Sequence, residues 1–529
     1  MNAPSDSSTG NLHAPQKGCL PHLGGRIGLF FYIPVGLIVL IGLLYVEEDW
    51  RGDKVWAQTK AELEARGECF DRAKFIPPPV PDDQNFGALD YFQTTSDGRL
   101  RINKAIEPVI IKEPYSIDDA KENKGWLPYL GRWTKSEVTD TGAVEKQLEE
   151  FLHHRDPAAQ IQPGATPIDI FTKICPVVAD LRRANASRPL CRFELDYDNP
   201  KPWTIPLGPT TYNIQLAKML AYDSQLALLS HHPEIALEDS QVDLKIGTGL
   251  SREPLLVCGL VSLGVVAIQL NIIEQGLYEH DWNDAQLAQL DEALGKMNDL
   301  ADGQLSLRGD IAFFEIPATD AILTNRSLFL NQIFASGGSF NYKDIESWEN
   351  LGARLFYMYV PNGWLQQNRA NSVLRILDGT RSIDSGARRV YPERVYRATP
   401  RSENESLSFL TLTVGPMLNA VRKFAYQQAQ IDMARIACRL ERYRLAHGNY
   451  PATLNELLPA YATDLPQDII NGQPYIYRLD KDGTYLLYSV GWNQVDDHGD
   501  YGTSAYGPSL YSSSDSPDWV WINHPLPKR

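Results

Sequence analysis

The sequence predicts a mainly α-helical protein with one N-terminal transmembrane helix and a small α+β module at its C-terminal end. An uncharged apolar run near the start indicates the membrane helix, and apolar residues at helical spacing through the middle indicate a large helical domain. Near the end, a long helical stripe precedes two tyrosine-rich segments joined by a tight turn, which predicts a long helix packed on a small antiparallel sheet. The predicted units are a tail at 1–26, a transmembrane helix at 27–46, a juxtamembrane helix and proline-rich spacer at 47–85, a helical domain at 86–411 and an α+β domain at 412–529.

The composition excludes several classes of protein. Of 529 residues, 43% are hydrophobic and 22% are charged, which is typical of a folded globular chain. The formal net charge is −16, whereas nucleic-acid-binding proteins carry a basic surface. We therefore expect no nucleic-acid partner. Six cysteines in so long a chain do not make a disulfide-rich scaffold.

The membrane anchor is predicted from the run 27–46, which contains no charged residue. At 1.5 Å per residue, a helix of this length spans roughly 30 Å, the thickness of a bilayer's hydrocarbon core. Lys17 and Arg26 precede the run and three acidic residues, 47–49, follow it. The positive-inside rule therefore predicts an inner-membrane protein with a cytoplasmic N-terminus and a periplasmic bulk. A cleaved signal peptide is the alternative, although the run is long for one and lacks a small-residue cleavage site.

A second uncharged stretch, 255–273, is nearly long enough to span a membrane. It contains Ser262, Gln269 and Asn271, and amphipathic helical segments flank it, which favours a helix buried in the centre of the helical domain. A second span would instead return the C-terminal part of the chain to the cytoplasm.

Export would place five cysteines in an oxidising compartment. Cys175 and Cys191 are close in sequence and flank a polar stretch, so they are the pair that we expect to be bridged. Cys258 and Cys438 lie in apolar helical patterns and are expected to be buried thiols.

Local sequence signals predict further helices and a loop elsewhere in the chain. A helix at 49–70 leaves the membrane and ends before the proline-rich stretch 76–81, which is typical of a rigid spacer. Asn283 with Gln286 makes a capping box that begins a helix. Further helices are predicted at 169–183, 212–230, 350–360 and 366–377, and a loop at 378–406.

The C-terminal part of the chain gives the clearest signals of secondary structure. Met433, Ile436, Ala437, Leu440 and Tyr443 form one apolar stripe on a long helix. The helix ends at a glycine, 448, and a capping box at 453–456 begins a short second helix. A hairpin follows, with strands at 473–479 and 484–490, and then an acidic loop and a closing strand at 518–521.

This order of elements, with the run YRLAHGNYP at 443–451 and YSVG at 488–491, resembles the periplasmic domain of the type II secretion major pseudopilins. The resemblance covers 412–529. The whole chain, with its N-terminal span and the PPPVPDDQNF segment at 77–86, is similar to a set of large membrane-anchored bacterial proteins to which no chemistry is assigned. Pseudopilins carry their span at the start of the same long helix, after a peptidase site. Here the span lies far upstream and Ile33 replaces the expected glutamate, so we expect no cleavage and no pilus assembly.

In pseudopilins the acidic C-terminal loop binds calcium. The resemblance therefore implies a calcium site in the loop 491–500, with Asn493, Asp496, Asp497 and Asp500 as ligands. Such oxygen ligands suit calcium, although the spacing is not that of an EF-hand and a solvated acidic turn is the alternative.

No catalytic motif is present: the sequence has no phosphate-binding glycine loop, no G-x-S-x-G, no H-E-x-x-H and no C-x-x-C. Glu194, Asp196 and Asp198 alternate, which would place them on one face of a strand, either as paired catalytic carboxylates or as a solvated edge. The dipeptide His280-Asp281 could orient an imidazole, but no nucleophile is tied to it.

We therefore expect a membrane-anchored envelope protein with a non-catalytic binding or scaffolding role. Two alternatives stay open: an accessory of a type II secretion or pilus-like apparatus, with envelope proteins as partners, and an exported hydrolase whose site lies in the helical domain.

Overall fold

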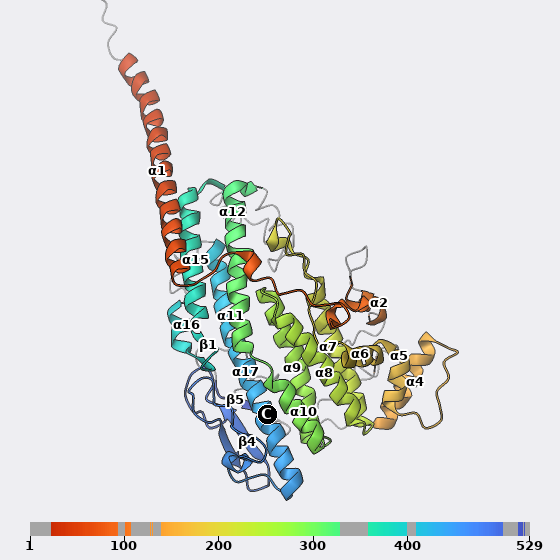
Figure 1. Ribbon diagram of the computed structural model, residues 1–529. Helices are drawn as coiled ribbons and strands as arrows, with labels where there is room; N and C mark the ends of the chain where they lie inside the picture. Colours follow the sequence, from red (N-terminus) through yellow and green to blue (C-terminus); the bar gives the residue numbers. More distant parts are fainter. Residues whose placement is uncertain are drawn as a thin grey trace, which may run out of the picture.

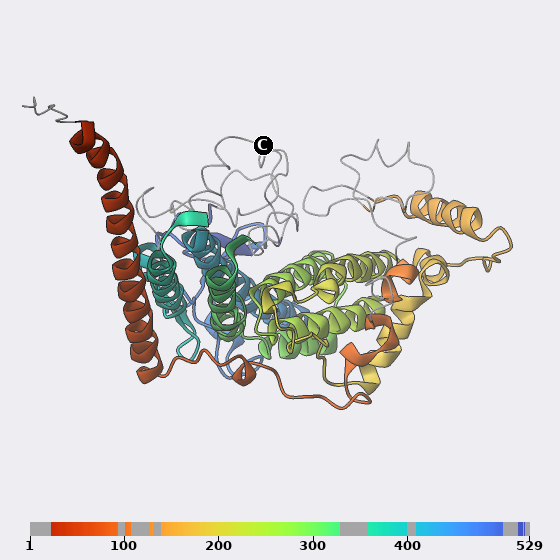
Figure 2. The same cartoon turned by 90° about the horizontal axis from the view of Figure 1, so that it is seen from above.

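The computed structural model describes residues 23–93, 101–106, 127, 130, 139–327, 358–398, 409–500, 517–521 and 523. Within these residues the protein is mainly helical, with small antiparallel sheets toward the C-terminal end. Helices α1 and α15 form one edge of the molecule and α4 to α6 the opposite edge, with α7 to α11 and α17 between them (Figures 1 and 2).

The elements follow one another along the chain. The helices are α1 (Leu23–Ala65), α2 (Arg101–Ile106), α4 (Thr141–Arg155), α5 (Pro167–Ile174), α6 (Pro176–Ser187), α7 (Gly208–Leu229), α8 (Pro233–Ser251), α9 (Leu256–Tyr278), α10 (Asp284–Gly295), α11 (Asp299–Asp310), α12 (Ile316–Thr324), α15 (Asn362–Thr380), α16 (Pro392–Ala398) and α17 (Phe409–His447). The strands are β1 (Ile383–Asp384), β2 (Arg389–Val390), β3 (Ile476–Leu479), β4 (Tyr485–Ser489) and β5 (Trp519–Trp521).

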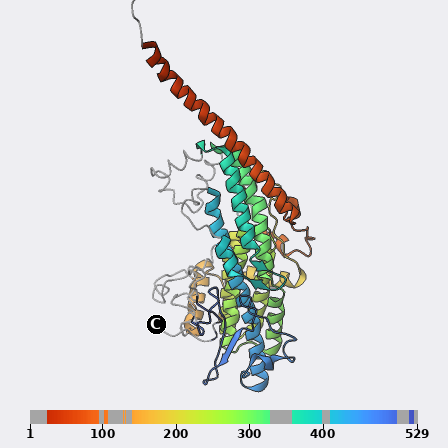
Figure 3. The ribbon, with the colours of Figure 1, turned by 90° about the vertical axis from the view of Figure 1, so that its left-hand side faces the viewer.

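Helix α1 is one uninterrupted helix of 43 residues. It contains the whole of the apolar run 27–46 and continues into the juxtamembrane helix, ending at Ala65 rather than at 70. The side chains of 32–47 are exposed, and this part of the helix projects beyond the bundle in Figures 1 and 3. The later part packs along α15.

The contact between α1 and α15 is a crossing of two backbones at glycines. A Cβ atom on Gly363 would lie 1.7 Å from the carbonyl oxygen of Glu48, and one on Gly52 would lie 2.2 Å from the Cα of Gly363. Side chains therefore have no room on either helix at this point. The Gly363 amide, in the first turn of α15, donates to Asp49 Oδ1 at 2.8 Å, so α1 supplies a capping carboxylate for α15.

The second apolar stretch forms α9, in the centre of the bundle. It is long and apolar enough to cross a membrane, yet most of that apolar window is buried. Helices α7, α8, α11 and α17 pack against it. Buried polar side chains find partners on α8: Ser262 Oγ donates to the Gly247 carbonyl at 2.8 Å, and Gln269 donates to Ser240.

Two sequence predictions in the helical region are wrong in detail. The helix predicted at 169–183 is two helices, because Pro176 begins α6 and Cys175 is the residue between them. The stretch predicted as a loop at 378–406 contains the β1–β2 pair and α16. The capping box of Asn283 and Gln286 at the start of α10 is confirmed. Of the predicted helix 350–360, residues 350–357 lie outside the described part of the chain.

The C-terminal elements match the sequence prediction closely. Helix α17 ends at His447, and Gly448 follows with a left-handed φ of 83°. The capping box of Thr453 and Glu456 forms, around the short 3₁₀ helix Leu454–Leu457. Strands β3 and β4 pair antiparallel from Ile476↔Tyr488 to Leu479↔Tyr485, and β5 adds beside β4. The sheet packs on α17, which also contacts α9, α10, α11 and α15.

The expected disulfide between Cys175 and Cys191 is not formed, and both thiols are free. Cys175 precedes the 12 residues of α6, whereas Cys191 lies beyond its end against Gly249 of α8. A helix of that length is roughly 18 Å long, while bridged cysteines have Cα atoms about 4.4–6.8 Å apart. Cys258 and Cys438 are buried thiols, as predicted.

Candidate functional site

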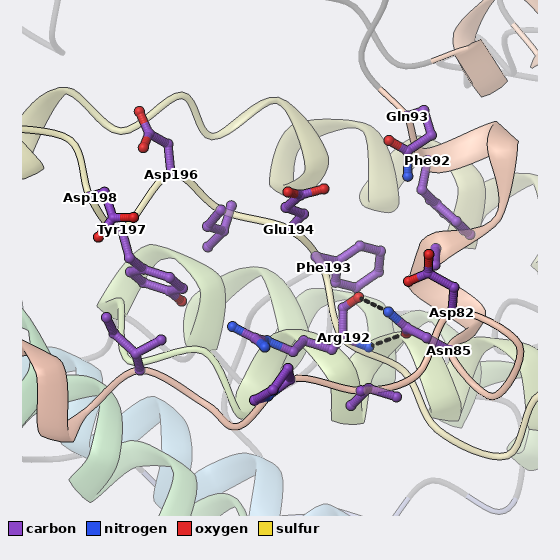
Figure 4. A pocket seen from close by; sticks show the side chains of 15 residues that line it. Asp82, Asn85, Phe92, Gln93, Arg192, Phe193, Glu194, Asp196, Tyr197 and Asp198 are labelled. Carbon is purple, nitrogen blue, oxygen red and sulfur yellow. Dashed lines mark hydrogen bonds between the residues drawn. The ribbon is translucent and has the colours of Figure 1, made fainter.

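An open trough lies between the segment 76–93, which begins with a proline-rich stretch, and the segment 192–198, which ends in a turn at Tyr197 and Asp198 (Figure 4). Its volume is about 980 Å³. A second cavity of about 820 Å³ continues it toward 200–203 and α12. The two cavities share Ile76, Tyr197 and Asp198, so they form one elongated depression, whose second part is lined by α12 and by the short 3₁₀ helices Arg72–Lys74 and Pro202–Thr204.

One wall carries the three alternating carboxylates noted in the sequence. Phe193, Leu195 and Tyr197 are buried, and Glu194, Asp196 and Asp198 are exposed and line the trough. The alternation is as predicted, but the segment belongs to no sheet. Its single ladder contact in the described residues is the bridge between Leu190 and Asn85.

The side chain of Asn85 fastens the two walls together. Its Oδ1 accepts the amides of Gly87 at 3.0 Å and Arg192 at 2.8 Å, and its Nδ2 donates to the Arg192 carbonyl at 3.0 Å. The Phe86 amide donates to the Leu190 carbonyl at 2.7 Å. The segment predicted as a spacer is therefore a structural wall of the trough.

Proline explains why the walls stay apart beyond this point. Residues 77, 78, 79 and 81 are prolines, which have no amide hydrogen and cannot donate to a β-ladder. The two extended segments therefore pair at Asn85 and diverge along 76–81. This divergence leaves the trough open.

A buried carboxylate lies beneath the acidic wall. Glu253 lies between α8 and α9 and is fully buried. It accepts a hydrogen bond from the Tyr197 hydroxyl. Burial raises the pKa of Glu253 to about 7, and the Tyr197 hydroxyl, the Arg192 charge and the Phe193 amide oppose that rise. Oε1 of Glu253 has no hydrogen-bond partner among the residues that the structure describes.

The electrostatic character of the first cavity is acidic. Four carboxylates line it, those of Asp82, Glu194, Asp196 and Asp198, against one cation, Arg192. Figure 4 shows the Glu194 and Asp196 carboxylates on one side of their backbone and the Arg192 side chain reaching the other way, toward Tyr197. A positively charged ligand suits this arrangement.

A smaller cavity of about 260 Å³ lies where α9 ends beside the C-terminal sheet. His280 there has a left-handed φ of 60°, and its Nδ1 lies 2.9 Å from Glu441 Oε1 on α17. Glu441 also accepts Arg444, at 2.6 and 2.8 Å, and the Tyr450 hydroxyl, at 2.8 Å. The imidazole is thus oriented by Glu441 and not by Asp281, which the sequence suggested. The described lining residues bring no serine or cysteine to this site.

The proposed calcium ligands are engaged mainly with one another and with the loop backbone. Asn493 Nδ2 donates to Asp497 Oδ2 at 2.8 Å, and Asp496 Oδ1 accepts the Tyr488 hydroxyl at 2.9 Å and the His498 amide at 2.9 Å. Among the described residues, no group of three or more His, Cys, Asp or Glu side chains stands at metal-binding distances.

Asp518 is a member of this region that the sequence did not single out. It is fully buried, its Oδ2 accepts the Gly499 amide at 2.7 Å, and its Oδ1 has no partner in the described chain. Burial raises its pKa to about 6; the amides of Gly499 and Asp497 lower the pKa, and the negative charges of Asp497 and Asp496 raise it.

Comparisons with protein-family models, with curated proteins and with solved structures found no match to the chain. The pseudopilin resemblance of 412–529 stays a prediction from the sequence. The accessory role in a secretion or pilus-like apparatus, which depends on that resemblance, stays a prediction with it.

Glu441 makes a testable contribution to stability. Burial raises the pKa of this carboxyl, but hydrogen bonds from Arg444, His280 and Tyr450 outweigh burial and hold the pKa at about 2. A carboxylate whose pKa is depressed in the folded state stabilises the fold above its ordinary pKa, and that stabilisation is lost as the pH falls toward the folded pKa. We expect Glu441→Gln to lower the free energy of unfolding by about 2 kcal/mol at neutral pH, and by progressively less between about pH 5 and pH 2.

Urea unfolding of the wild type and of Glu441→Gln across this pH range measures the difference between their free energies of unfolding. Glu292→Gln is the matched control, since Glu292 forms an exposed ion pair with Lys296. A constant difference between Glu441→Gln and wild type at every pH would contradict the assignment.

Proposed function

We propose that the protein is a single-span protein of the bacterial inner membrane whose periplasmic helical domain binds an extended, positively charged peptide segment in the trough. The role is binding, without catalysis. The observation that carries the proposal is the elongated acidic trough between the segments 76–93 and 192–198.

The anchor is supported by the exposure of the apolar part of α1. Side chains 32–47 are exposed although nearly all of them are apolar, and Val46 at the end of the run is 68% exposed. An apolar helical surface of this length is unfavourable in water and favourable in a bilayer. The charges on either side of 27–46 favour an N-terminus in the cytoplasm.

The size and shape of the trough favour an extended ligand. Pockets for small molecules have volumes of about 300–1,000 Å³, and the first cavity alone reaches the top of that range before the second continues it. Along the acidic wall, the backbone N–H and C=O of Glu194 make no hydrogen bond within the described chain. A peptide strand can pair with such an edge, which would satisfy these groups.

The charge of the lining favours a basic peptide. Along the wall, Glu194 and Asp196 lie two residues apart, which is also the side-chain period of a strand, and Asp198 follows in a turn. Lysine or arginine at alternate positions of a paired peptide would meet these carboxylates. Exposed ion pairs contribute about 0.2–1 kcal/mol each, and salt screens them.

Binding of a labelled ten-residue peptide of alternating lysine and valine tests this proposal. The full chain in nanodiscs is titrated and the anisotropy of the peptide is measured. We expect saturable binding that Glu194→Gln/Asp196→Asn/Asp198→Asn weakens about tenfold, since three lost pairs amount to about 1.4 kcal/mol. The same peptide with alternate N-methylated amides is expected to bind more weakly, because it cannot pair with the backbone of the wall.

The control variant removes the same charge from α4, with Glu145, Glu149 and Glu150 each changed to glutamine, and is expected to bind as wild type does. Equal binding of a peptide of alternating glutamate and valine, or an unchanged affinity in the trough variant, would contradict the proposal.

We also propose a calcium ion at the acidic loop 491–500, with Asn493, Asp496, Asp497 and Asp500 as the ligands implied by the pseudopilin resemblance. The buried Asp518 supports this site. One of its oxygens has no partner in the described chain, and the negative charges of Asp496 and Asp497 raise its pKa. Carboxylate and amide oxygens are the kind of ligand that calcium prefers.

Thermal melting of the full chain with and without calcium tests the second proposal. With an affinity typical of extracellular calcium modules, about 5 mM calcium is expected to raise the melting temperature by about 2–4 °C. The variant Asp518→Asn is expected to lose that rise, whereas Asp480→Asn in the exposed hairpin turn keeps it. An unchanged melting temperature of the wild type would contradict the calcium site.

A further inference from the structure

The turn before α15 carries an unusual exposed surface. Met358, Tyr359 and Trp364 are 39%, 67% and 44% exposed. They account for three of the ten exposed large hydrophobic side chains that the structure describes outside α1. Large apolar side chains this exposed are unfavourable in water, so the question is what else could cover them.

This surface lies against α1 where its apolar run ends. The Tyr45 hydroxyl donates to the Tyr359 carbonyl, and Trp364 Nε1 donates to Glu48 Oε2 at 3.1 Å. Trp50, one turn further along α1, is 63% exposed. Three aromatic residues, Tyr45, Tyr359 and Trp364, therefore meet where α1 contacts the start of α15, and Trp50 lies five residues beyond Tyr45 along α1.

We propose that Met358, Tyr359 and Trp364, together with Trp50, form an aromatic edge that rests in the headgroup layer of the same bilayer that α1 crosses. The partner is the lipid bilayer itself. This inference rests on the proposed membrane anchor and goes beyond it, because it places a surface of the folded domain in contact with lipid.

The depth of the aromatic edge fits the headgroup layer. The apolar run ends at Val46, and Trp50 is four residues beyond it, about 6 Å along a helix. The polar layer on each side of a bilayer's hydrocarbon core is about 5–8 Å thick. Tryptophan and tyrosine concentrate at this depth, because their rings are apolar and their N–H or O–H groups can reach water.

The main objection to this placement is the acidic cluster 47–49, of which Glu47 is exposed and the other two side chains are engaged in hydrogen bonds. Asp49 caps α15 through the Gly363 amide. Glu48 accepts Trp364, Gln367 and Arg51. These two carboxylates are thus directed at α15 and its neighbours and are partly covered, so they do not face an anionic lipid surface.

The turn is held in a fixed shape, so its exposed side chains have a fixed position relative to α1. Arg326, just after α12, donates to the carbonyls of Met358 at 3.1 Å and Val360 at 2.5 Å, and to Asn362. The aromatic edge and α1 therefore approach the membrane as one body.

Photo-crosslinking to lipid tests the proposal. A benzophenone amino acid is placed at Leu40, at Tyr359 or at Val495 in the full chain, which is reconstituted in liposomes of phosphatidylcholine and phosphatidylglycerol. Leu40 lies within the apolar run, and Val495 is an exposed side chain, at 55%, in the distant C-terminal loop. We expect lipid adducts, detected by mass spectrometry, at positions 40 and 359 and none above background at 495.

The other outcomes separate the two proposals. Adducts at 40 without adducts at 359 would overturn the aromatic edge and keep the anchor. Absence of adducts at both 40 and 359 would overturn the anchor and the aromatic edge together. Equal adducts at all three positions would show unspecific contact and would also overturn the aromatic edge.

Discussion

The close crossing of α1 and α15 at Gly52 and Gly363 is the constraint on which the rest of the architecture depends. The two backbones approach so closely that no side chain fits between them. Beyond the crossing the helices run in the same direction: Trp364 contacts Glu48, Arg369 stacks on Trp56 at 4.0 Å, and Arg381 pairs with Glu68 at 3.0 Å. Overpacking such a contact costs about 1–3 kcal/mol.

This contact makes the end of α1 part of the helical bundle instead of a linker. About 28 Å of helix separates Val46 from Ala65. The proline-rich wall of the trough follows after a short connection, and Asn85 ties that wall to Arg192. If α1 spans the membrane as proposed, the proposed binding trough lies at a fixed position relative to the bilayer, because α1 is helical from Val46 to Ala65.

Local sequence signals predicted the elements that depend on neighbouring residues. Gly448, the capping boxes at 283–286 and 453–456 and the tyrosine-rich segments of the hairpin all specify structure within a few residues, and each prediction was confirmed. The burial alternation of 193–198 was also predicted. The break at Pro176 was missed, because helical periodicity continues on both sides of it.

The candidate sites were less predictable, since they depend on contacts between distant residues. His280 meets Glu441, 161 positions later, so its sequence neighbour Asp281 gave the wrong partner. The stretch 76–81 looked like a spacer because prolines dominate its composition, and only the contacts of the nearby Asn85 reveal that it belongs to a wall of the trough. The predicted disulfide between Cys175 and Cys191 was wrong because it was based on closeness in sequence, whereas the whole of α6 lies between the two cysteines. Asp518 lies beyond the acidic loop in sequence, and the sheet alone brings it there.

Hydrogen exchange of the α1 amides in nanodiscs, followed by mass spectrometry, tests the central claim most directly. If α1 is docked on α15, amides 47–56 exchange as slowly as those of a buried helix, and Gly363→Leu accelerates their exchange while Gly142→Leu does not. Gly142 is the matched control, because it is also the second residue of its helix and a Cβ atom added there would meet only the Asp140 carboxylate, at 3.6 Å. Fast exchange of 47–56 in the wild type, or equal exchange in the two variants, would contradict the claim.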